Sequence, residues 1–321
     1  MNDDVAALPA YRDLPVAADA PPGSAWGVFG RDDQIGTLNL LTPERRAAAA
    51  GLARRGATFN LDLPLDLPAI PFFAHRAPPT HRLVGRRDGN SRDDYLDGFA
   101  LQYSSQWDGL RHMRSPRHGF YNWTRDADVD APDGRLGIEH VARHGIVGRG
   151  VLLDVARHVE ARGDPLAPDA RRELPPTLLD EVARAQGVEL RVGDVLLVRT
   201  GVGAMLHAEA AAGQRSAQPR TDYAGPGLES SDATLAWLWD RHVAAVASDN
   251  VAVEAWPPVS AESFLHFRAL PLLGVTFGEL FDLEALAADC ARDGVYEMLF
   301  VGKPLMLRGG VGSPANALAI K

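Results

Sequence analysis

Gln102-Tyr-Ser-Ser-Gln-Trp-Asp-Gly-Leu-Arg-His112 is the stretch around which this chain is organised. Gln102, Ser104, Gln106 and Asp108 fall at even spacings, so on a β-strand their side chains would point to one face. A half-buried strand usually fills one face with apolar side chains, whereas this face carries two carboxamides, a hydroxyl and a carboxylate. Because burying unpaired polar groups is costly, the face is either a solvent-exposed edge or a functional site.

Helices and strands alternate on both sides of this stretch. Helices typically begin at capping residues or prolines and end near glycines. On these signals, helices are expected at 42–55, Leu136–His144, Pro175–Gln186, Ser231–Trp239 and Leu283–Arg292. Strands are expected where apolar or alternating runs are short, at Thr58–Leu63, Phe99–Gln106, Gly150–Val155, Asp194–Arg199, Val243–Ala247, Tyr296–Phe300 and Leu305–Leu307. This alternation predicts an α/β architecture with a mixed sheet.

The chain shows no internal repeat and no clear linker, so we expect a single domain over 26–321. Residues 1–25, rich in Pro, Ala and Asp, are expected to form an extended N-terminal arm. The Pro- and Gly-rich segment 68–97 reads as a long irregular loop, which is usually functional or mobile in a compact domain. The segment 203–228 also lacks a clear pattern.

Composition narrows the class of protein. The 321 residues are 46% hydrophobic and 23% charged, as in ordinary globular proteins, and their net charge of −9 argues against nucleic acid or anionic membrane as a partner. Cys290 is the single cysteine, so it is expected to be reduced and buried. No apolar run reaches the length of a membrane span, and the acidic start is unlike a signal peptide. We therefore expect a cytoplasmic protein.

Motifs of several large enzyme classes are missing from the sequence. It contains no dinucleotide fingerprint or phosphate-binding loop and no nucleophile elbow. The polar residues left as candidates are Asp108, His112, His118, Asp249, Asn250, Glu254, His266 and Glu279. No spacing argument brings His266 or Glu279 to Asp108, so the residues alone indicate only an α/β protein with a possible hydrolytic site.

The order of several motifs from Trp26 onward resembles the cyclase superfamily, which includes bacterial kynurenine formamidase and isatin hydrolase. Each motif is short, and their order along nearly the whole chain carries the resemblance. They are Asp33-Gln-Ile-Gly-Thr-Leu-Asn39, Gln106-Trp-Asp-Gly-Leu-Arg-His112, His144-Gly-Ile-Val-Gly-Arg-Gly-Val-Leu-Leu-Asp154, Gly193-Asp-Val-Leu-Leu-Val-Arg-Thr-Gly201, Ala247-Ser-Asp-Asn-Val-Ala-Val-Glu254, Gly278-Glu-Leu-Phe-Asp-Leu283 and Gly309-Gly-Val-Gly-Ser-Pro-Ala-Asn316. The resemblance implies the swivelling β/β/α fold, with a mixed, barrel-like central sheet and outer helices.

The resemblance also implies a metal site. In the family motif, a histidine is followed after three residues by a second histidine, then after one residue by an aspartate and after three more by a last histidine. Here Asp108 matches the aspartate, and His112 matches the last, acid/base histidine. Gln102 and Gln106 occupy the positions where the family has its two ligand histidines. His266 and Glu279 match the downstream histidine and glutamate that complete the site.

The two glutamines change the expected metal chemistry. A carboxamide oxygen is a weaker and harder ligand than imidazole, better suited to manganese, magnesium or calcium than to zinc. Three alternatives stay open. In the first, Asp108, His266 and Glu279 weakly hold one divalent ion, manganese or zinc. In the second, the glutamines, Gln106 among them, are also ligands of a manganese or magnesium ion. In the third, no metal binds and the glutamines orient substrate or water.

By resemblance, the expected activity is hydrolysis of a C–N bond in a small, aromatic or cyclic amide, lactam or formamide. His112 would act as the acid/base because its pKa lies near neutrality, with Asp108 and His266 as the other catalytic candidates. Gln102, Gln106, Trp107 and Tyr103 are the expected substrate-binding residues, although aromatic residues such as Trp107 and Tyr103 more often belong to the core.

Two other classes remain open. One is a metal-independent lyase, dehydratase or cyclase that uses His112 and Asp108 for proton transfer. The other is a non-catalytic protein that binds small molecules. The resemblance further implies a homodimer or homotetramer, with the N-terminal arm and the 68–97 loop as candidate exchange elements.

Overall fold

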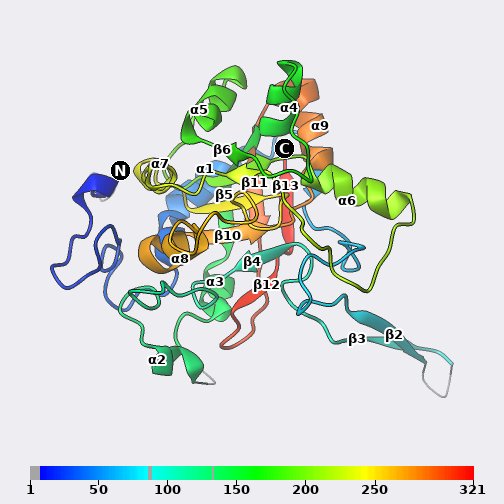
Figure 1. Ribbon diagram of the computed structural model, residues 1–321, viewed down its shortest axis with the longest axis horizontal. Helices are drawn as coiled ribbons and strands as arrows, with labels where there is room; N and C mark the ends of the chain where they lie inside the picture. The colour runs from blue at the N-terminus through cyan, green and yellow to red at the C-terminus, as the bar shows by residue number, and fades with distance from the viewer. Residues whose placement is uncertain (1–7, 86–88, 132–133) are drawn as a thin grey trace.

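One mixed β-sheet runs through the centre of the computed structural model, which describes residues 8–85, 89–131 and 134–321 (Figure 1). Its strands lie in the order β1-β13-β11-β5-β7-β9-β10-β4-β12. The strands β5, β7, β9 and β10 are parallel, and antiparallel strands flank them on both sides. Helices lie outside this sheet (Figure 1), which confirms the predicted mixed α/β fold.

The helical elements are short and lie between strands for most of the chain. Those described are η2 (Tyr11–Asp13), η3 (Gly36–Leu40), α1 (Pro43–Ala50), α2 (Asp126–Asp130), α3 (Ile138–His144), α4 (Val155–Ala161), α5 (Pro176–Ala185), α6 (Val202–Ala211), α7 (Asp232–Asp240), α8 (His266–Arg268), η4 (Ala269–Leu273) and α9 (Glu284–Asp293).

The strands fall into the central sheet and two small ribbons, β2–β3 and β6–β8. Their bounds are β1 (Thr58–Asn60), β2 (Thr80–Gly85), β3 (Arg92–Asp97), β4 (Gln106–Asp108), β5 (Ile146–Asp154), β6 (Glu173–Leu174), β7 (Val195–Arg199), β8 (Gly227–Leu228), β9 (Ala245–Ser248), β10 (Thr276–Glu279), β11 (Glu297–Gly302), β12 (Gly312–Pro314) and β13 (Ala317–Ile320).

Local sequence signals explain several of these bounds. The side chain of Thr42 accepts a hydrogen bond from Arg45 N at the start of α1, and Ser231 caps α7 by accepting from Thr234 N. Gly145, with φ of 74°, ends α3. The central strands β7 and β9 are apolar and buried, as strands covered on both faces are.

The sheet brings β10 between β9 and β4, and this register builds the floor of the polar site described below. Gly278 of β10 is required there, because a Cβ at this position would lie only 2.7 Å from Phe281 and 2.8 Å from Ala247. On the core side, the ring of Trp107 packs edge-on against Phe281 and Phe300, with centroids 5.1 and 6.0 Å apart.

Some expected elements were wrong. The strand predicted at Phe99–Gln106 is β4, which covers only Gln106–Asp108, because the preceding residues turn and bury their polar groups on loops. Ser104, for example, donates to Pro64 O, 3.2 Å away. No strand forms at Leu305–Leu307, which is largely exposed.

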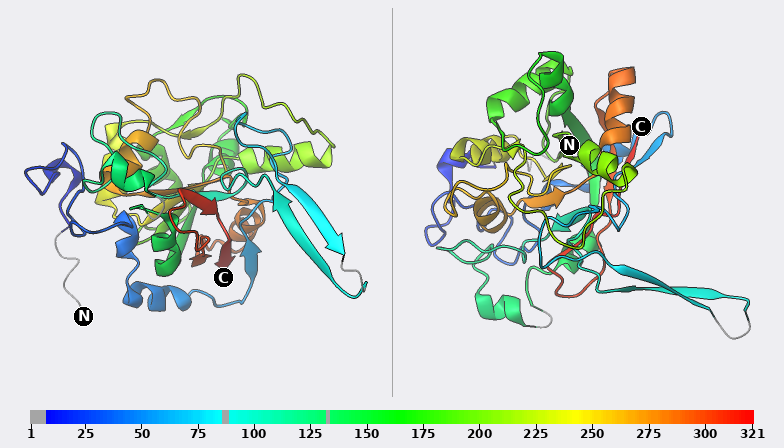
Figure 2. Two further views of the ribbon diagram at one scale, coloured as in Figure 1. Left: turned by 90° about the horizontal axis from the view of Figure 1, so that it is seen from below. Right: turned by 45° about the vertical axis from the view of Figure 1, so that its right-hand side comes forward.

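Two segments predicted to be irregular contain regular structure. The 68–97 loop includes the β2–β3 hairpin, which projects from the body (Figures 1 and 2). The 203–228 segment begins with α6, whose alanine-rich sequence has no amphipathic stripe to signal it. The helix expected over 42–55 ends at Ala50 in the structure.

Part of the N-terminal arm is held against the body. Tyr11 N donates to Asp240 Oδ1 at 2.7 Å, and Trp239 Nε1 donates to Pro9 O at 2.8 Å. Residues 1–7 of the predicted arm lie outside the described residues. In the described part of the chain, no helix has the length and apolar character needed to span a membrane.

Candidate active site

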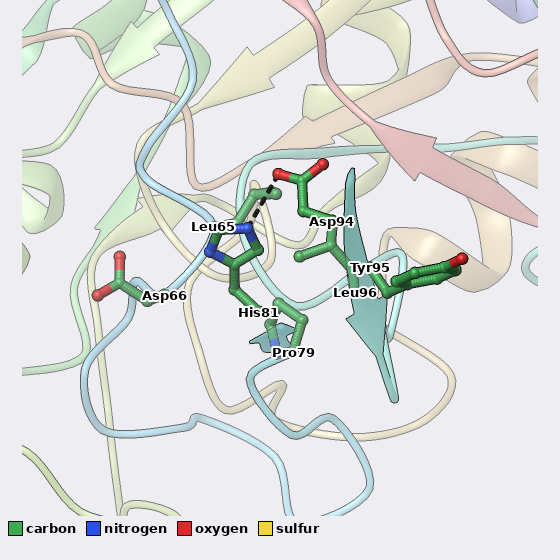
Figure 3. Close-up of a pocket in the computed structure, with 7 residues that line it drawn as sticks. All are labelled: Leu65, Asp66, Pro79, His81, Asp94, Tyr95 and Leu96. Carbon is green, nitrogen blue, oxygen red and sulfur yellow. Dashed lines mark hydrogen bonds and ion pairs between the residues drawn. The ribbon is translucent and has the colours of Figure 1, made fainter. Parts of the chain in front are cut away.

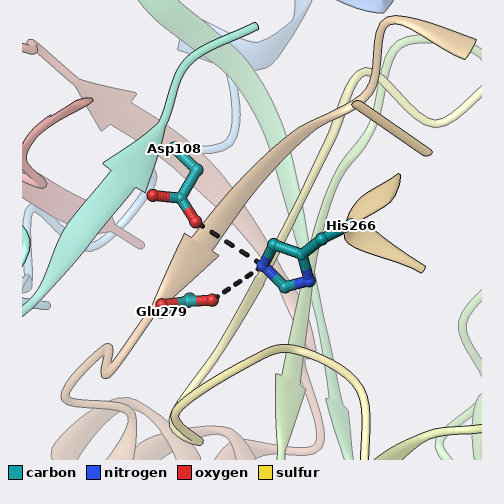
Figure 4. A group of neighbouring side chains, drawn as sticks. All are labelled: Asp108, His266 and Glu279. Carbon is teal, nitrogen blue, oxygen red and sulfur yellow. Dashed lines mark hydrogen bonds and ion pairs between the residues drawn. The ribbon is translucent and has the colours of Figure 1, made fainter. Parts of the chain in front are cut away.

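Strand pairing places the polar residues of the motif on one face of the sheet. Gln106 and Asp108 point to the same side of β4, because strand side chains alternate. Glu279 of β10 lies directly opposite Gln106, and His266 reaches the same point from the start of α8. Asp108, His266 and Glu279 therefore meet, although 158 to 171 residues of chain separate Asp108 from the other two (Figure 4).

This group is tightly spaced and buried. His266 Nε2 lies 3.0 Å from Glu279 Oε1 and 3.6 Å from Asp108 Oδ2. One ligand atom from each of the three side chains lies within 4.8 Å of the others. None of the three residues is more than 3% exposed. A buried cluster of one imidazole and two carboxylates could hold a divalent metal ion.

Glu254 fixes the orientation of the imidazole from behind. Its Oε1 lies 2.8 Å from His266 Nδ1 and accepts from His266 N at 3.1 Å, while its Oε2 accepts from Leu265 N at 2.7 Å. A carboxylate on the second ring nitrogen is the usual outer partner of a metal-binding histidine. No role for Glu254 was expected from the sequence, although this residue ends the motif Ala247-Ser-Asp-Asn-Val-Ala-Val-Glu254.

The two glutamines hold the carboxylates by hydrogen bonds. Gln102 Nε2 donates to Asp108 Oδ1 and lies 3.3 Å from His112 Nδ1, and Gln106 Nε2 donates to Glu279 Oε2. Gln106 Oε1 and Asp108 Oδ2, both buried, have no hydrogen-bond partner. Buried acceptors without partners are costly, so these two oxygens are the atoms with most to gain from a cation.

The buried charges shift each other's pKa. Burial alone would raise the pKa of Asp108, but the imidazoles of His112 and His266 outweigh it and hold that pKa at about 2. Burial and the neighbouring Asp108 carboxylate raise the pKa of Glu279. Burial opposes the charged form of His266, yet the neighbouring carboxylates of Asp108, Glu254 and Glu279 raise its pKa well above the usual value. Without a metal, the proton on His266 Nε2 offsets part of the negative charge of the Asp108 and Glu279 carboxylates.

These residues fit a single divalent ion. Asp108 Oδ2, His266 Nε2 and a Glu279 oxygen would be the ligand atoms, and the unpartnered Gln106 Oε1 would be a third oxygen on the same face. Three oxygens and one nitrogen suit manganese or magnesium better than a set of imidazoles would. A metal would take the place that the His266 proton occupies, since both use Nε2.

His112 stands at the solvent side of the group. Its Nε2 lies 3.7 Å from Asp108 Oδ1, and its side chain is 14% exposed where those of Asp108 and His266 are buried. Burial lowers the pKa of His112, while the Asp108 carboxylate opposes that change. His112 therefore has both the access and the proton chemistry of an acid/base group.

Other predicted residues lie elsewhere. Trp107 points from the opposite face of β4 into the core and is fully buried, so it does not reach the site. Tyr103 is buried too, with its hydroxyl donating to Pro68 O, but it borders a small hollow beside Gln102. His118 lines a separate surface pocket. Arg199 pairs internally with Asp154 and Glu284.

Asp249, another polar candidate, caps a helix. Its carboxylate accepts from Thr200 N and Thr200 Oγ1, both at 2.7 Å, and from Gly201 N at 2.8 Å. These donors lie at the start of α6, where backbone N–H groups lack helical partners. Asp249 is therefore a structural residue in this fold.

A wide hollow lies away from this chemistry. It measures about 920 Å³ and lies at the root of the β2–β3 hairpin, lined by Leu65, Asp66, Pro79, His81, Asp94, Tyr95 and Leu96 (Figure 3). His81 Nε2 and Asp94 Oδ2 pair there at 3.0 Å, but both side chains are more than half exposed. The solvent-exposed pair lacks the buried setting of the Asp108 group.

Comparisons with known proteins agree with this architecture. The Cyclase family model ("Putative cyclase") matches residues 61–255, and the chain belongs to this family. The crystal structure of a novel cyclase shares 34% identity, with a TM-score of 0.79 over 93% of this chain and 99% of that one. No curated protein matches the chain.

Isatin hydrolases share the fold at lower identity. Isatin hydrolase A from Labrenzia aggregata, bound to benzyl benzoate, has 16% identity and a TM-score of 0.59, covering 85% of this chain and 97% of its own. Isatin hydrolase A from Ralstonia solanacearum has 19% identity and a TM-score of 0.58, covering 85% and 95%. These likenesses support the predicted swivelling, barrel-like α/β fold.

Proposed function

We propose that this protein hydrolyses a C–N bond in a small amide, lactam or formamide. The observation that carries the proposal is the buried Asp108–His266–Glu279 group with His112 at its solvent side. Membership of the Cyclase family and the fold shared with isatin hydrolases support the same reaction class. The substrate carbonyl would lie beside His112, at the solvent side of this group.

Each residue has a role in that reaction. Asp108, His266 and Glu279 would hold a divalent ion, which when bound supplies Lewis-acid assistance to the carbonyl and to the attacking water. His112 takes the proton from the water as the C–O bond forms, because the Asp108 carboxylate, 3.7 Å from His112 Nε2, stabilises the imidazolium. His112 then gives this proton to the leaving nitrogen as the C–N bond breaks.

A metal-independent lyase, dehydratase or cyclase is the second candidate. One observation favours it: the amide groups of Gln102 and Gln106 already donate to both carboxylates, and the His266 imidazolium neutralises part of their charge. In that reaction class His112 and Asp108 move protons on a carbonyl substrate, and the glutamines orient it.

Metal analysis and turnover assays distinguish the two. The protein would be purified without chelator, its metal content measured, and hydrolysis of isatin and formanilide followed with and without Mn²⁺ or Zn²⁺. We expect metal-dependent hydrolysis that falls by about 10²- to 10⁴-fold in His112→Asn, the usual contribution of a general acid/base. Turnover that needs no metal and resists chelator would favour the second candidate, and hydrolysis unchanged in His112→Asn would contradict the role of this residue.

A further inference from the structure

Arg76 places a positive charge beside the candidate active site. It lies in the loop between β1 and β2, where its Nη1 donates to Gln102 O at 3.0 Å. Its guanidinium sits over the ring of Phe73, 5.0 Å from the centroid. Arg76, Phe73 and Gln102 line the same small hollow, and the Gln102 side chain bonds Asp108. Arg76 is therefore linked to the buried group through a single intervening residue, Gln102.

The charge of Arg76 has no carboxylate partner among the described residues, whereas two other partly buried arginines, Arg149 and Arg199, are paired with carboxylates. Arg149 meets Asp194 at 2.6 Å, and Arg199 meets Asp154 at 2.8 Å. Arg76 bonds only a backbone carbonyl. A guanidinium that is stacked on an aromatic ring and keeps free donors is pre-organised to bind a carboxylate in a two-pronged contact.

The field of Arg76 reaches the catalytic group. Its positive charge lowers the pKa of Asp108 and of Glu279, and it also lowers the pKa of His112. This electrostatic effect agrees with the contact between Arg76 and Asp108 through Gln102. An anion bound at Arg76 would therefore be close to the reacting atoms.

Aromatic side chains connect Arg76 to His266. Phe73 packs edge-on against Trp256 with centroids 5.4 Å apart, and Trp256 lies 6.4 Å from Phe264. Phe264 in turn stacks on the His266 imidazole at 4.7 Å with nearly parallel planes. Phe73, Trp256 and Phe264 are each only partly buried, so each ring keeps part of its surface exposed along the row from Arg76 to His266.

We propose that Arg76 determines substrate specificity by binding a carboxylate carried on an aromatic ring, while Phe73, Trp256 and Phe264 bind the ring itself. The inference deepens the proposed function and rests on it: the substrate class becomes aromatic amides that carry an acidic group. Arg76 is a binding residue in this scheme and takes no part in proton transfer.

Binding of two matched probes tests the role of Arg76 without turnover. The probes are 2-aminobenzoate and its neutral counterpart 2-aminoacetophenone, measured by calorimetry. We expect the wild type to bind the anion at least about tenfold more tightly, and Arg76→Gln to lose about tenfold for the anion but less than about twofold for the ketone, as loss of a charge-assisted contact requires. Arg82→Gln on the exposed hairpin, where Arg82 pairs with Asp97 at 2.9 Å, is the control and should leave both affinities unchanged.

Each alternative outcome is decisive. Equal loss of both probes in Arg76→Gln would show that Arg76 only supports the loop, and equal affinity of the wild type for both would overturn the inference directly. A preference for the anion without hydrolysis of isatin or formanilide would refute the proposed function and keep Arg76 as an anion-binding residue. Hydrolysis without that preference would refute this inference alone.

Discussion

Gln106 and Glu279 lie directly opposite each other in the antiparallel β4–β10 pair, and Gln106 Nε2 donates a hydrogen bond to Glu279 Oε2. The resemblance places a metal-binding histidine at this position, but here Gln106 donates a hydrogen bond to Glu279, one of the three residues that could hold a metal ion. The amide oxygen of Gln106, left without a partner, faces away from that bond. The strand register therefore couples the metal affinity of the site to a single amide.

Restoring an imidazole at this position should strengthen zinc binding. Gln106→His supplies a nitrogen ligand in place of a weak carboxamide oxygen. We expect at least a tenfold gain in Zn²⁺ affinity. Residues that only hydrogen-bond to metal ligands already change metal affinity by about this factor. Competition with a colorimetric zinc chelator measures the dissociation constant, and Gln106→Asn, which keeps the amide, is the control. Unchanged zinc affinity in Gln106→His would contradict the ligand set.

Removing the charge behind His266 should weaken the site while sparing the fold. Glu254→Gln keeps the size of the side chain but replaces the carboxylate that meets His266 Nδ1 at 2.8 Å. Outer partners of this kind typically contribute 10- to 100-fold to metal affinity or activity, and we expect about that loss. Ser230→Ala is the matched control, because it removes a contact to the other carboxylate oxygen. An equal loss in both variants would point to general loosening of the loop.

Asp249 should matter for stability and not for chemistry. Asp249→Ala leaves the buried N–H groups of Thr200 and Gly201 without an acceptor at the start of α6. The loss of unfolding free energy should be about 2–4 kcal/mol, in line with unsatisfied buried donors and a lost helix cap. Urea unfolding measures this value. Activity per folded molecule should stay near that of the wild type, and a selective loss of activity would place Asp249 in the site instead.

Cys290 should resist thiol reagents in the folded protein. It is fully buried in α9, and burial raises the pKa of its thiol to about 11, with Lys321 acting against that rise. Because only the thiolate reacts, almost none is available at pH 8. Labelling with a chromogenic disulfide should be slow in buffer and fast in denaturant. Rapid stoichiometric labelling of the folded protein would contradict this burial.

The projecting hairpin should mediate the predicted self-association. Leu83 and Leu96 are exposed by 67% and 41% on the same face of β2–β3, and an isolated two-stranded hairpin is marginal in water. A second copy that packs on this face would cover both leucines. We expect the double variant Leu83→Asp/Leu96→Asp to be monomeric and the wild type dimeric by light scattering. A monomeric wild type would refute the prediction.

Local signals were sufficient for many elements and insufficient for others. Thr42 and Ser231 marked helix starts, and the apolar run before Arg199 marked a buried strand. Helix capping and a continuous apolar run can both be recognised from residues adjacent in the sequence. The β2–β3 hairpin was missed because its strands are exposed and charged, which hides the alternation that identifies a strand. Helix α6 was missed because its small residues carry no apolar stripe.

The sequence by itself determined that Gln106 and Asp108 share a face, since the two-residue period of a strand needs no partner. It also supplied His112 through its position in the motif. Only the tertiary structure decided that Glu279 lies opposite Gln106, that Glu254 orients His266, and that Trp107 belongs to the core. These relationships join residues far apart in the chain, and they depend on strand order and register, which no local pattern specifies.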